Sequence, residues 1–283
     1  MSWAVFLAAL VSAALNAGWN VLAKRQKVPS EAVLGTLLVT ALIFLAAIPF
    51  IGLPASAAWP WLAVAAVCNV AYSRALMAAY DRAPLSMTFS VVRAIIPPML
   101  FVLGMLFFAE GATALRLVGM ALVVISLVLF GWPGRGQSAG HLSGFVLAGL
   151  AGLVVSVAYA CDIKGARVAG GHTLAIVQYG AASSLLSTSG LLAVALIEKR
   201  APVAILKRNW RACTVAAMLL IASYFLALWA YTRGPVGLVA PVRETSILFG
   251  GLLAFAVLRE RIRPRQWIAI GLAVLGAMIV KIQ

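Results

Sequence analysis

Charged residues are scarce in this chain of 283 residues, and acidic residues are the scarcest of them. Only 10% of the residues are charged, with 7 Asp and Glu against 22 Lys and Arg, while 64% are hydrophobic. A soluble domain averages about a quarter charged residues. A surface of this composition would not keep the protein in water. The composition therefore excludes an ordinary soluble protein and predicts a chain that lies in a lipid bilayer.

Residues that bind metals or form disulfides are also few. The three cysteines, Cys68, Cys161 and Cys213, lie in or at the edge of apolar segments, and the histidines, His141 and His172, lie in expected loops. An odd number of cysteines so placed is neither a disulfide framework nor a metal site. The sequence also lacks a nucleotide-binding motif. We therefore expect no metal, no cofactor, no enzymatic activity and no direct use of ATP.

Ten long apolar runs fill most of the chain. Each is near the roughly 20 residues that a helix needs to cross a bilayer, and their continuous pattern argues against a membrane β-barrel. The first run has no basic segment before it, so it is expected to be a transmembrane helix and not a cleaved signal. The expected helices, with ends defined to about three residues, are 2–23, 32–52, 59–80, 84–108, 114–132, 142–163, 173–197, 212–232, 235–258 and 265–281.

The chain contains an internal repeat. Tyr80-Asp81-Arg82-Ala83-Pro84 joins two apolar runs in the first half, and Tyr231-Thr232-Arg233-Gly234-Pro235 does the same in the second half. The helix that follows each proline contains one arginine, Arg93 in the first copy and Arg243 in the second. A duplicated set of membrane helices with charges at matching depths is typical of secondary transporters.

The two copies divide the chain into two domains. A Gly-, Pro- and Ser-rich stretch at 133–141 is expected to link a first domain, 1–132, to a second domain, 142–283, with five helices in each. Because five is odd, two such copies joined directly must cross the membrane in opposite orientations. The predicted fold is an all-α integral membrane protein with ten transmembrane helices in two inverted five-helix repeats. Such a repeat offers two packings of similar energy, as alternating access requires.

The net charge of +15 has an ordinary cause in a membrane protein. Most of the Lys and Arg lie in the loops that follow the odd-numbered helices, so the positive-inside rule predicts that these loops are cytoplasmic and that both termini are external. Aromatic residues do not alternate with basic ones in any soluble module, so we expect contact with anionic lipids and no binding of nucleic acid.

Arg93 and Arg243 are the strongest candidates for a site. An ionisable side chain at the centre of a membrane helix costs about 2.5–3.5 kcal/mol on insertion scales, and it usually faces a cavity. Arginine presents a planar fork of donors that fits carboxylate, phosphate or phosphonate. We expect the two arginines to bind the acidic group of a substrate, while Glu244 holds an ammonium group or a coupling proton. The alternative is an internal ion pair, such as Glu244 with Arg93, that only fastens the fourth helix to the ninth.

Other polar and aromatic residues occur at helical spacing and are candidates to line the same cavity. For each of them the alternative is a helix–helix contact or an anchor at the membrane interface, and Arg74 lies near enough to its helix end to snorkel. The further candidates for substrate binding are Asn16, Trp19, Asn20, Tyr72, Arg74, Ser90, Tyr159, Gln178, Tyr224 and Ser246.

Three prolines lie beside the expected site. Pro97 and Pro98 follow Arg93 by one turn, and Pro241 precedes Arg243 by two residues. Proline inside a helix removes backbone hydrogen bonds and kinks the helix. We therefore expect these three positions to act as hinges or gates.

The remaining acidic residues have simpler expected roles. Glu110 and Glu260 each follow one of the buried arginines by 17 residues, at helix ends, and are expected to fix the hairpins in which they lie. Asp162 lies two residues before Lys164 at the expected end of its helix, so a local pair between them is the expectation.

Several segments of the chain resemble the EamA branch of the drug/metabolite transporter superfamily. These are the hairpin patterns Glu110…Gly119 and Leu258-Arg259-Glu260…Trp267…Gly271, the helix end Gly18-Trp19-Asn20-Val21…Lys24, and Ala240-Pro241-Val242-Arg243-Glu244-Thr245-Ser246. Gly18 and Trp19 stand in the opposite order to the family's Trp-Gly. The resemblance covers essentially the whole chain and implies a membrane transporter. The family is drawn with cytoplasmic termini, which is opposite to the orientation that the loop charges predict.

The sequence thus predicts a secondary transporter of the bacterial inner membrane. The resemblance does not define the substrate, because members of the family move amino acids, aromatic compounds, drugs, choline and sugar phosphates. The charged residues favour a small anionic or zwitterionic metabolite, such as an amino acid, with a coupling proton or a counter-substrate. The resemblance implies an aminoalkylphosphonate as a further candidate, because some members of the similar group are associated with phosphonate metabolism. The protein is expected to act as a monomer or a homodimer. The alternatives are an exporter of hydrophobic or cationic compounds, and a membrane enzyme or scaffold subunit.

Overall fold

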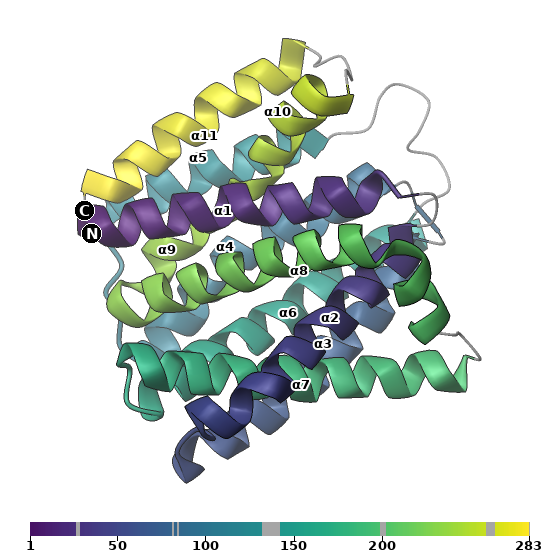
Figure 1. The fold of residues 1–283 in the computed structure, drawn as a ribbon. Coiled ribbons are helices and arrows are strands. Elements are labelled where there is room, and N and C mark those ends of the chain that lie inside the picture. Colours follow the sequence, from purple (N-terminus) through teal and green to yellow (C-terminus); the bar gives the residue numbers. More distant parts are fainter. Residues whose placement is uncertain are drawn as a thin grey trace.

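The chain folds into a bundle of helices (Figure 1). A computed structural model describes residues 1–26, 29–80, 82–83, 85–131, 142–198, 202–258 and 264–282, and these residues are almost entirely helical. Seven of the described helices are long and apolar enough to cross a membrane by length and composition, so this is a multi-pass membrane protein. The helices are α1 (Trp3–Lys24), α2 (Pro29–Ile51), η1 (Ser56–Ala58), α3 (Trp59–Tyr80), α4 (Leu85–Phe108), α5 (Ala114–Gly131), α6 (Leu142–Val168), α7 (Thr173–Ile197), α8 (Pro202–Arg233), α9 (Val236–Glu244), α10 (Ser246–Leu258) and α11 (Pro264–Ile282).

Most of the helices occur where the apolar runs predict them, and two extend further. α6 continues to Val168, well beyond the expected end at 163, and α8 begins at Pro202, well before the expected start at 212. The added part of α8 contains basic residues and joins the apolar span at Asn209, whose backbone leaves the helical conformation (φ −128°, ψ 25°). Hydropathy missed both extensions because each contains Lys and Arg, which interrupt the apolar run. The linker expected at 133–141 lies outside the described residues.

The ninth expected helix consists of two helices, α9 and α10, which meet at Thr245. The Thr245 hydroxyl donates to the carbonyl of Val242 at 2.6 Å. A side-chain bond of this kind satisfies a carbonyl that the end of a helix would otherwise leave unpaired. Pro241 lies inside α9, before this interruption, whereas α4 runs without a break through Pro97 and Pro98.

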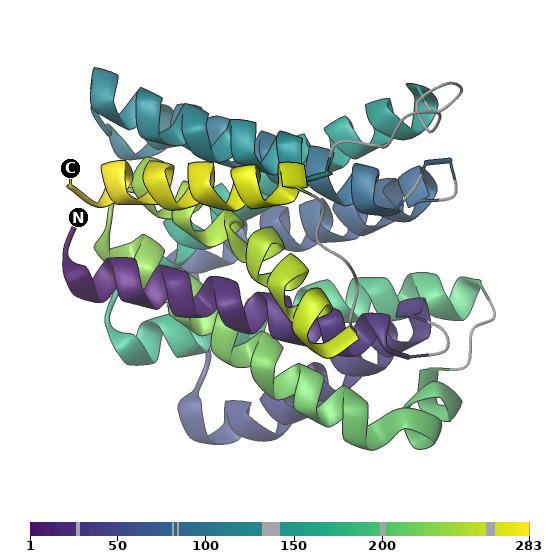
Figure 2. The ribbon, with the colours of Figure 1, turned by 90° about the horizontal axis from the view of Figure 1, so that it is seen from above.

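Helices from the first half of the chain pack mainly against helices from the second half. α1 packs on α8 and on α9–α10, α3 on α6 and α7, and α5 on α11, while α4 lies against α6 and α9. Figure 2 shows this interleaving from above, with the two chain ends close together at one end of the bundle. The largest core cluster is formed where α4, α6, α8 and α9 meet, around residues such as Ile96, Val155 and Leu238.

Small residues let the helices approach closely. A Cβ added at Gly276 of α11 would come within 2.8 Å of the carbonyl oxygen of Gly119 on α5, and one at Gly152 of α6 would meet Ile95 of α4 at 3.0 Å. Reciprocal hydrogen bonds join α1 to α8, because the hydroxyl of Ser12 donates to the carbonyl of Ser223 at 2.7 Å and the hydroxyl of Ser223 donates to the carbonyl of Ser12 at 2.8 Å. Close backbones and interhelical hydrogen bonds are the usual means of holding helices together in lipid.

Glu110 fastens the end of α4 to the start of α9. Its Oε1 accepts from the backbone N–H of Val236 at 2.5 Å, and its Oε2 accepts from that of Gly237 at 3.0 Å. The first N–H groups of a helix have no partner within the helix and carry partial positive charge. Glu110 therefore caps a helix in the other half of the chain instead of only fixing its own hairpin. Glu260 lies outside the described residues.

Glu110→Gln is expected to destabilise the protein by about 1–2 kcal/mol, because the amide provides one acceptor oxygen in place of two and removes the charge at the helix N-terminus. Thermal unfolding of the purified protein in detergent measures this effect. Glu31→Gln is the control, since Glu31 pairs with Arg208 in an exposed position. An equal, small effect of the two substitutions would show that the cap adds nothing to stability.

Candidate functional site

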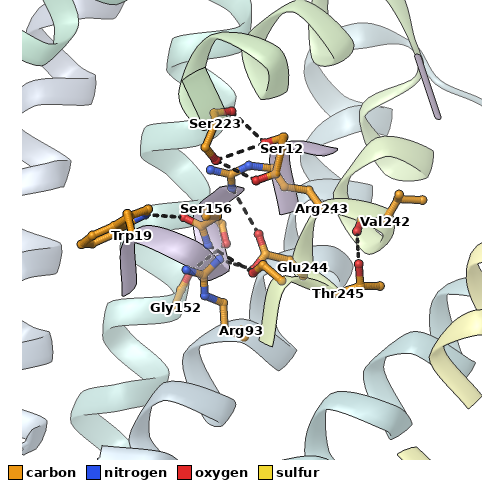
Figure 3. Close-up of polar contacts among 12 residues, drawn as sticks. Ser12, Trp19, Arg93, Gly152, Ser156, Ser223, Val242, Arg243, Glu244 and Thr245 are labelled. Atoms are coloured by element: carbon orange, nitrogen blue, oxygen red, sulfur yellow. Dashed lines mark hydrogen bonds and ion pairs between the residues drawn. The ribbon is translucent and has the colours of Figure 1, made fainter. Parts of the chain in front are cut away.

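Arg93, Arg243 and Glu244 form a buried cluster between α4 and α9 (Figure 3). Arg93 Nη1 donates to Glu244 Oε2 at 2.7 Å, and Arg243 Nη1 donates to Glu244 Oε1 at 3.2 Å. Glu244 is fully buried and each arginine is 7% exposed. One carboxylate thus bridges two guanidinium groups that come from different halves of the chain. The ion pair between Glu244 and Arg93 that the sequence offered as an alternative is present.

The cluster carries an excess positive charge. Two guanidinium groups face one carboxylate, and the sum is one positive charge in the interior of the protein. The guanidinium carbon of Arg243 also lies 4.7 Å from the centre of the Tyr159 ring, at cation–π distance. The Nε atom of Arg243 is buried without a hydrogen-bond partner. A buried donor left unpaired costs free energy, so an acceptor brought by a ligand would be bound favourably here.

A small cavity opens beside Arg243, between α6, α8 and α9. On α8 the lining residues recur at positions 224, 227, 228 and 231, which is the spacing of one face of a helix. The space open to the centre of a water molecule is about 20 Å³, enough for about one water. The cavity is lined by Tyr159, Asp162, Ile163, Tyr224, Ala227, Leu228, Tyr231 and Arg243.

Asp162 lies on the wall of this cavity and does not pair with Lys164. The Ser183 hydroxyl donates to Asp162 Oδ1 at 2.9 Å, and the Tyr179 hydroxyl donates to the same oxygen at 3.2 Å. Lys164 instead points toward the carbonyl of Phe107 at 3.5 Å, in an exposed position. The local pair expected from the sequence is not formed. Residues two apart in a helix do not face each other, and Asp162 is buried while Lys164 lies in an exposed position.

The candidates on α1 form a separate network that contacts α10. Asn16 Nδ2 donates to the hydroxyl of Ser246 at 3.2 Å, and Trp19 Nε1 donates to Asn16 Oδ1 at 2.9 Å. Asn20 Nδ2 donates to the backbone carbonyl of Asn16 at 2.7 Å. These bonds lie within α1, except that of Asn16 to Ser246, which joins α1 to the start of α10. They lie outside the lining of the cavity, which favours the helix–helix alternative for them.

The remaining candidates are distributed over the molecule. Arg74 is exposed and pairs with Glu198, and Gln178 donates to the backbone carbonyl of Ile51 at 2.7 Å, so the structure brings neither to the cavity. Tyr72 packs against the largest core cluster. The side chain of Ser90 lies outside the described part of the chain. Of the predicted aromatic residues, Tyr159 and Tyr224 line the cavity.

Sequence reasoning missed Asp162 and Tyr231 as cavity residues. A signal for both was available in the spacing. Asp162 follows Tyr159 by three residues, and Tyr231 follows Tyr224 by seven, so each lies on the same helix face as a residue that was predicted. The sequence pairs Asp162 with Lys164, two residues further on, and presents Tyr231 only as part of the repeat.

Comparison with known proteins gives a match to a family model and matches among solved structures. Residues 142–282 match the sequence model of the EamA-like transporter family. Among solved structures, one crystal structure described simply as that of a protein matches with a TM-score of 0.77 and 18% sequence identity, covering 98% of this chain and 95% of that chain. At this identity the match shows a shared fold alone. No curated protein matches the chain at a significant level.

Proposed function

Since the chain belongs to the EamA-like transporter family of the drug/metabolite transporter superfamily, we propose that it moves a small anionic or zwitterionic metabolite across the bacterial inner membrane by alternating access. The observation that carries this proposal is Arg243, a buried arginine on the wall of a cavity, in a cluster with one excess positive charge. Amino acids and aminoalkylphosphonates have the chemistry that fits. A proton or a counter-substrate would supply the driving force, and the unit is a monomer or a homodimer.

Two five-helix halves in opposite orientation would give the moving parts, with α9 and α10 counted as one span. The packing supports this arrangement. α1 lies on α8 as α6 lies on α3, α2 lies on α8 as α7 lies on α3, and α4 lies on α6 as α9–α10 lies on α1. In each pair, the second contact is the equivalent of the first after the two halves are exchanged. The contact between α5 and α11 is its own equivalent, because these helices hold the same position in the two halves. A two-fold relation between the halves produces this pattern, and inverted repeats of this kind allow alternating access.

Within the cluster the three charged residues would have different roles. Both oxygens of Glu244 bond arginines, so Glu244 acts as the anchor that holds the guanidinium groups and not as the partner of a substrate amine. The ion pair of Arg93 with Glu244 joins the first half of the chain to the second, and Arg93 is absent from the lining of the cavity. Arg243 lines the cavity and would bind the acidic group of the substrate through its remaining donors.

Binding requires the helices around the cavity to separate. A space that holds about one water does not admit an amino acid. The walls come from α6, α8 and α9, and α9 is joined to α10 only through Thr245. A break of this kind lets the two helix segments change their relative direction, so we place the hinge of the second half at Thr245, with Pro241 beside it.

The aromatic lining by Tyr159, Tyr224 and Tyr231, with the carboxylate of Asp162 beside it, favours the alternative, the export of hydrophobic cations. Against it, the guanidinium group of Arg243 already lies 4.7 Å from the centre of the Tyr159 ring. A second cation at this ring would be repelled by Arg243, and the anionic or zwitterionic substrate remains the better proposal.

A thermal-shift measurement on the purified protein tests the substrate class. We expect alanine, 2-aminoethylphosphonate or ethylphosphonate to raise the unfolding temperature, because a ligand at 100 times its dissociation constant stabilises by about 2.7 kcal/mol. Tetraphenylphosphonium serves as the hydrophobic cation. Stabilisation by tetraphenylphosphonium alone would contradict the proposed anion site and favour the efflux alternative.

A further inference from the structure

Asp162 is a buried acid that the proposed anion site leaves without a role. It is 4% exposed, and its two hydrogen bonds, from Ser183 and Tyr179, both reach Oδ1. Among the described residues, no basic side chain forms an ion pair with it. Two hydroxyl groups are weak compensation for a carboxylate inside a membrane protein, where an ionised group normally pairs with an opposite charge. The carboxylate is therefore suited to a cation that a ligand brings.

The cavity contains a negative and a positive pole. Asp162 and Arg243 line the same space, from α6 and α9. Arg93, Arg243, Glu244 and Asp162 together sum to zero charge. An anion alone would neutralise the arginine side and leave Asp162 unpaired. A molecule that carries one negative and one positive group satisfies both poles and leaves the site neutral.

Two hydroxyl groups on the cavity wall have no hydrogen-bond partner of ordinary geometry inside the described protein. They belong to Tyr224 and Tyr231; both hydroxyls are buried, and Tyr231 is only 3% exposed. Both residues come from the face of α8 that lines the cavity. Buried hydroxyl groups are normally hydrogen-bonded, so two hydroxyl groups without a well-formed internal bond are available to polar atoms of a ligand.

From this arrangement we propose that Asp162 binds the ammonium group of a zwitterionic substrate whose acidic group is bound by Arg243 and the hydroxyl of Tyr231. This proposal rests on the proposed function and makes it more specific. It places the binding site for the positive group of the substrate at Asp162 on α6. It also excludes simple anions as the preferred substrate. Glu244 is unsuited to this role, since both of its oxygens bond arginines.

Paired ligands that differ only in the amine test the subsite. 2-Aminoethylphosphonate and ethylphosphonate share the acidic group, and their dissociation constants for the purified protein can be measured by calorimetry. The wild-type protein is expected to bind the amino compound about 10- to 100-fold more tightly, because a hydrogen bond to a charged partner contributes about 1.5–3 kcal/mol. In Asp162→Asn this ratio is expected to fall to near one. Asparagine retains an oxygen that can accept from Ser183 and Tyr179, so the fold is preserved.

Tyr231→Phe is a second test at the acidic end. Its hydroxyl has no hydrogen-bond partner of ordinary geometry among the described residues. Removal is therefore expected to change the unfolding temperature little and to weaken the binding of both phosphonates by the same factor of about 5 to 10. Tyr179→Phe is the matched control, because the Tyr179 hydroxyl donates to Asp162 within the protein. That substitution is expected to lower stability.

The outcomes separate the two proposals. If wild-type protein binds both phosphonates equally, or if Asp162→Asn weakens both equally, the ammonium subsite is overturned while the anion site stands. If neither phosphonate binds, and alanine and propionate also fail to bind, the subsite and the proposed function fall together.

Discussion

Replacing Glu244 by glutamine is expected to lower the free energy of unfolding by about 3–5 kcal/mol, the effect measured when one partner of a buried ion pair is removed. Glu244 is fully buried and is bonded to Arg93 at 2.7 Å and to Arg243 at 3.2 Å. The amide cannot neutralise either guanidinium group. Two buried positive charges would then repel each other across the contact between α4 and α9, and the two halves of the chain would lose their central link.

Glu198→Gln is the matched control for this substitution. Glu198 pairs with Arg74, whose side chain is 51% exposed, and an exposed pair contributes about 0–1 kcal/mol. Chemical or thermal unfolding of both variants in detergent gives the comparison. A loss below about 1 kcal/mol for Glu244→Gln would contradict the view that this carboxylate anchors the cluster.

Arg243→Gln is expected to weaken the binding of ethylphosphonate by at least about 30-fold, since truncation of a buried, hydrogen-bonded charge pair costs about 2–5 kcal/mol. Arg93→Gln is the paired variant, because both arginines bond Glu244 and are equally buried, but only Arg243 lines the cavity. Arg93→Gln should therefore reduce stability more than ligand affinity.

Calorimetry on the two purified variants, together with uptake at matched expression, measures this difference. Arg243→Gln should abolish uptake of the bound ligand while the protein stays folded, because Glu244 retains Arg93. Uptake by Arg243→Gln at the wild-type rate, or an equal loss of affinity in both variants, would remove the anion site from Arg243.

Much of the fold follows from hydropathy, because crossing a bilayer demands long apolar runs with few charges. The runs 59–80 and 173–197 have the same limits as α3 and α7. The differences arise where polar residues continue a helix, as in α6 and α8, or where a short interruption is too small to change the average hydropathy, as at Thr245. Which helices pack together depends on surface shape, which a run of apolar residues does not specify.

For the site, charge was a better guide than polarity. Arg93, Arg243 and Glu244 were predicted from the cost of burying charge, and the structure brings the three together. The sequence did not predict which arginine lines the cavity and which only pairs with Glu244, since this depends on how the helices pack. Polar residues such as Asn16 form hydrogen bonds along a helix and between helices, and their presence in a span therefore says little about a ligand.

The most direct test of the account is the accessibility of the cavity from the two sides of the membrane. Ala227 lines the cavity and is 3% exposed, and Ala227→Cys adds one thiol there after Cys68, Cys161 and Cys213 are replaced. With the protein in sealed vesicles of both orientations, a membrane-impermeant thiol reagent is applied from outside, with and without 2-aminoethylphosphonate.

Alternating access to a single cavity predicts that the thiol of the Ala227→Cys variant is modified in both vesicle orientations, that modification stops uptake, and that the ligand protects the thiol. Modification in only one orientation, or a thiol that stays unreactive in both while uptake continues, would contradict a transport route through this cavity.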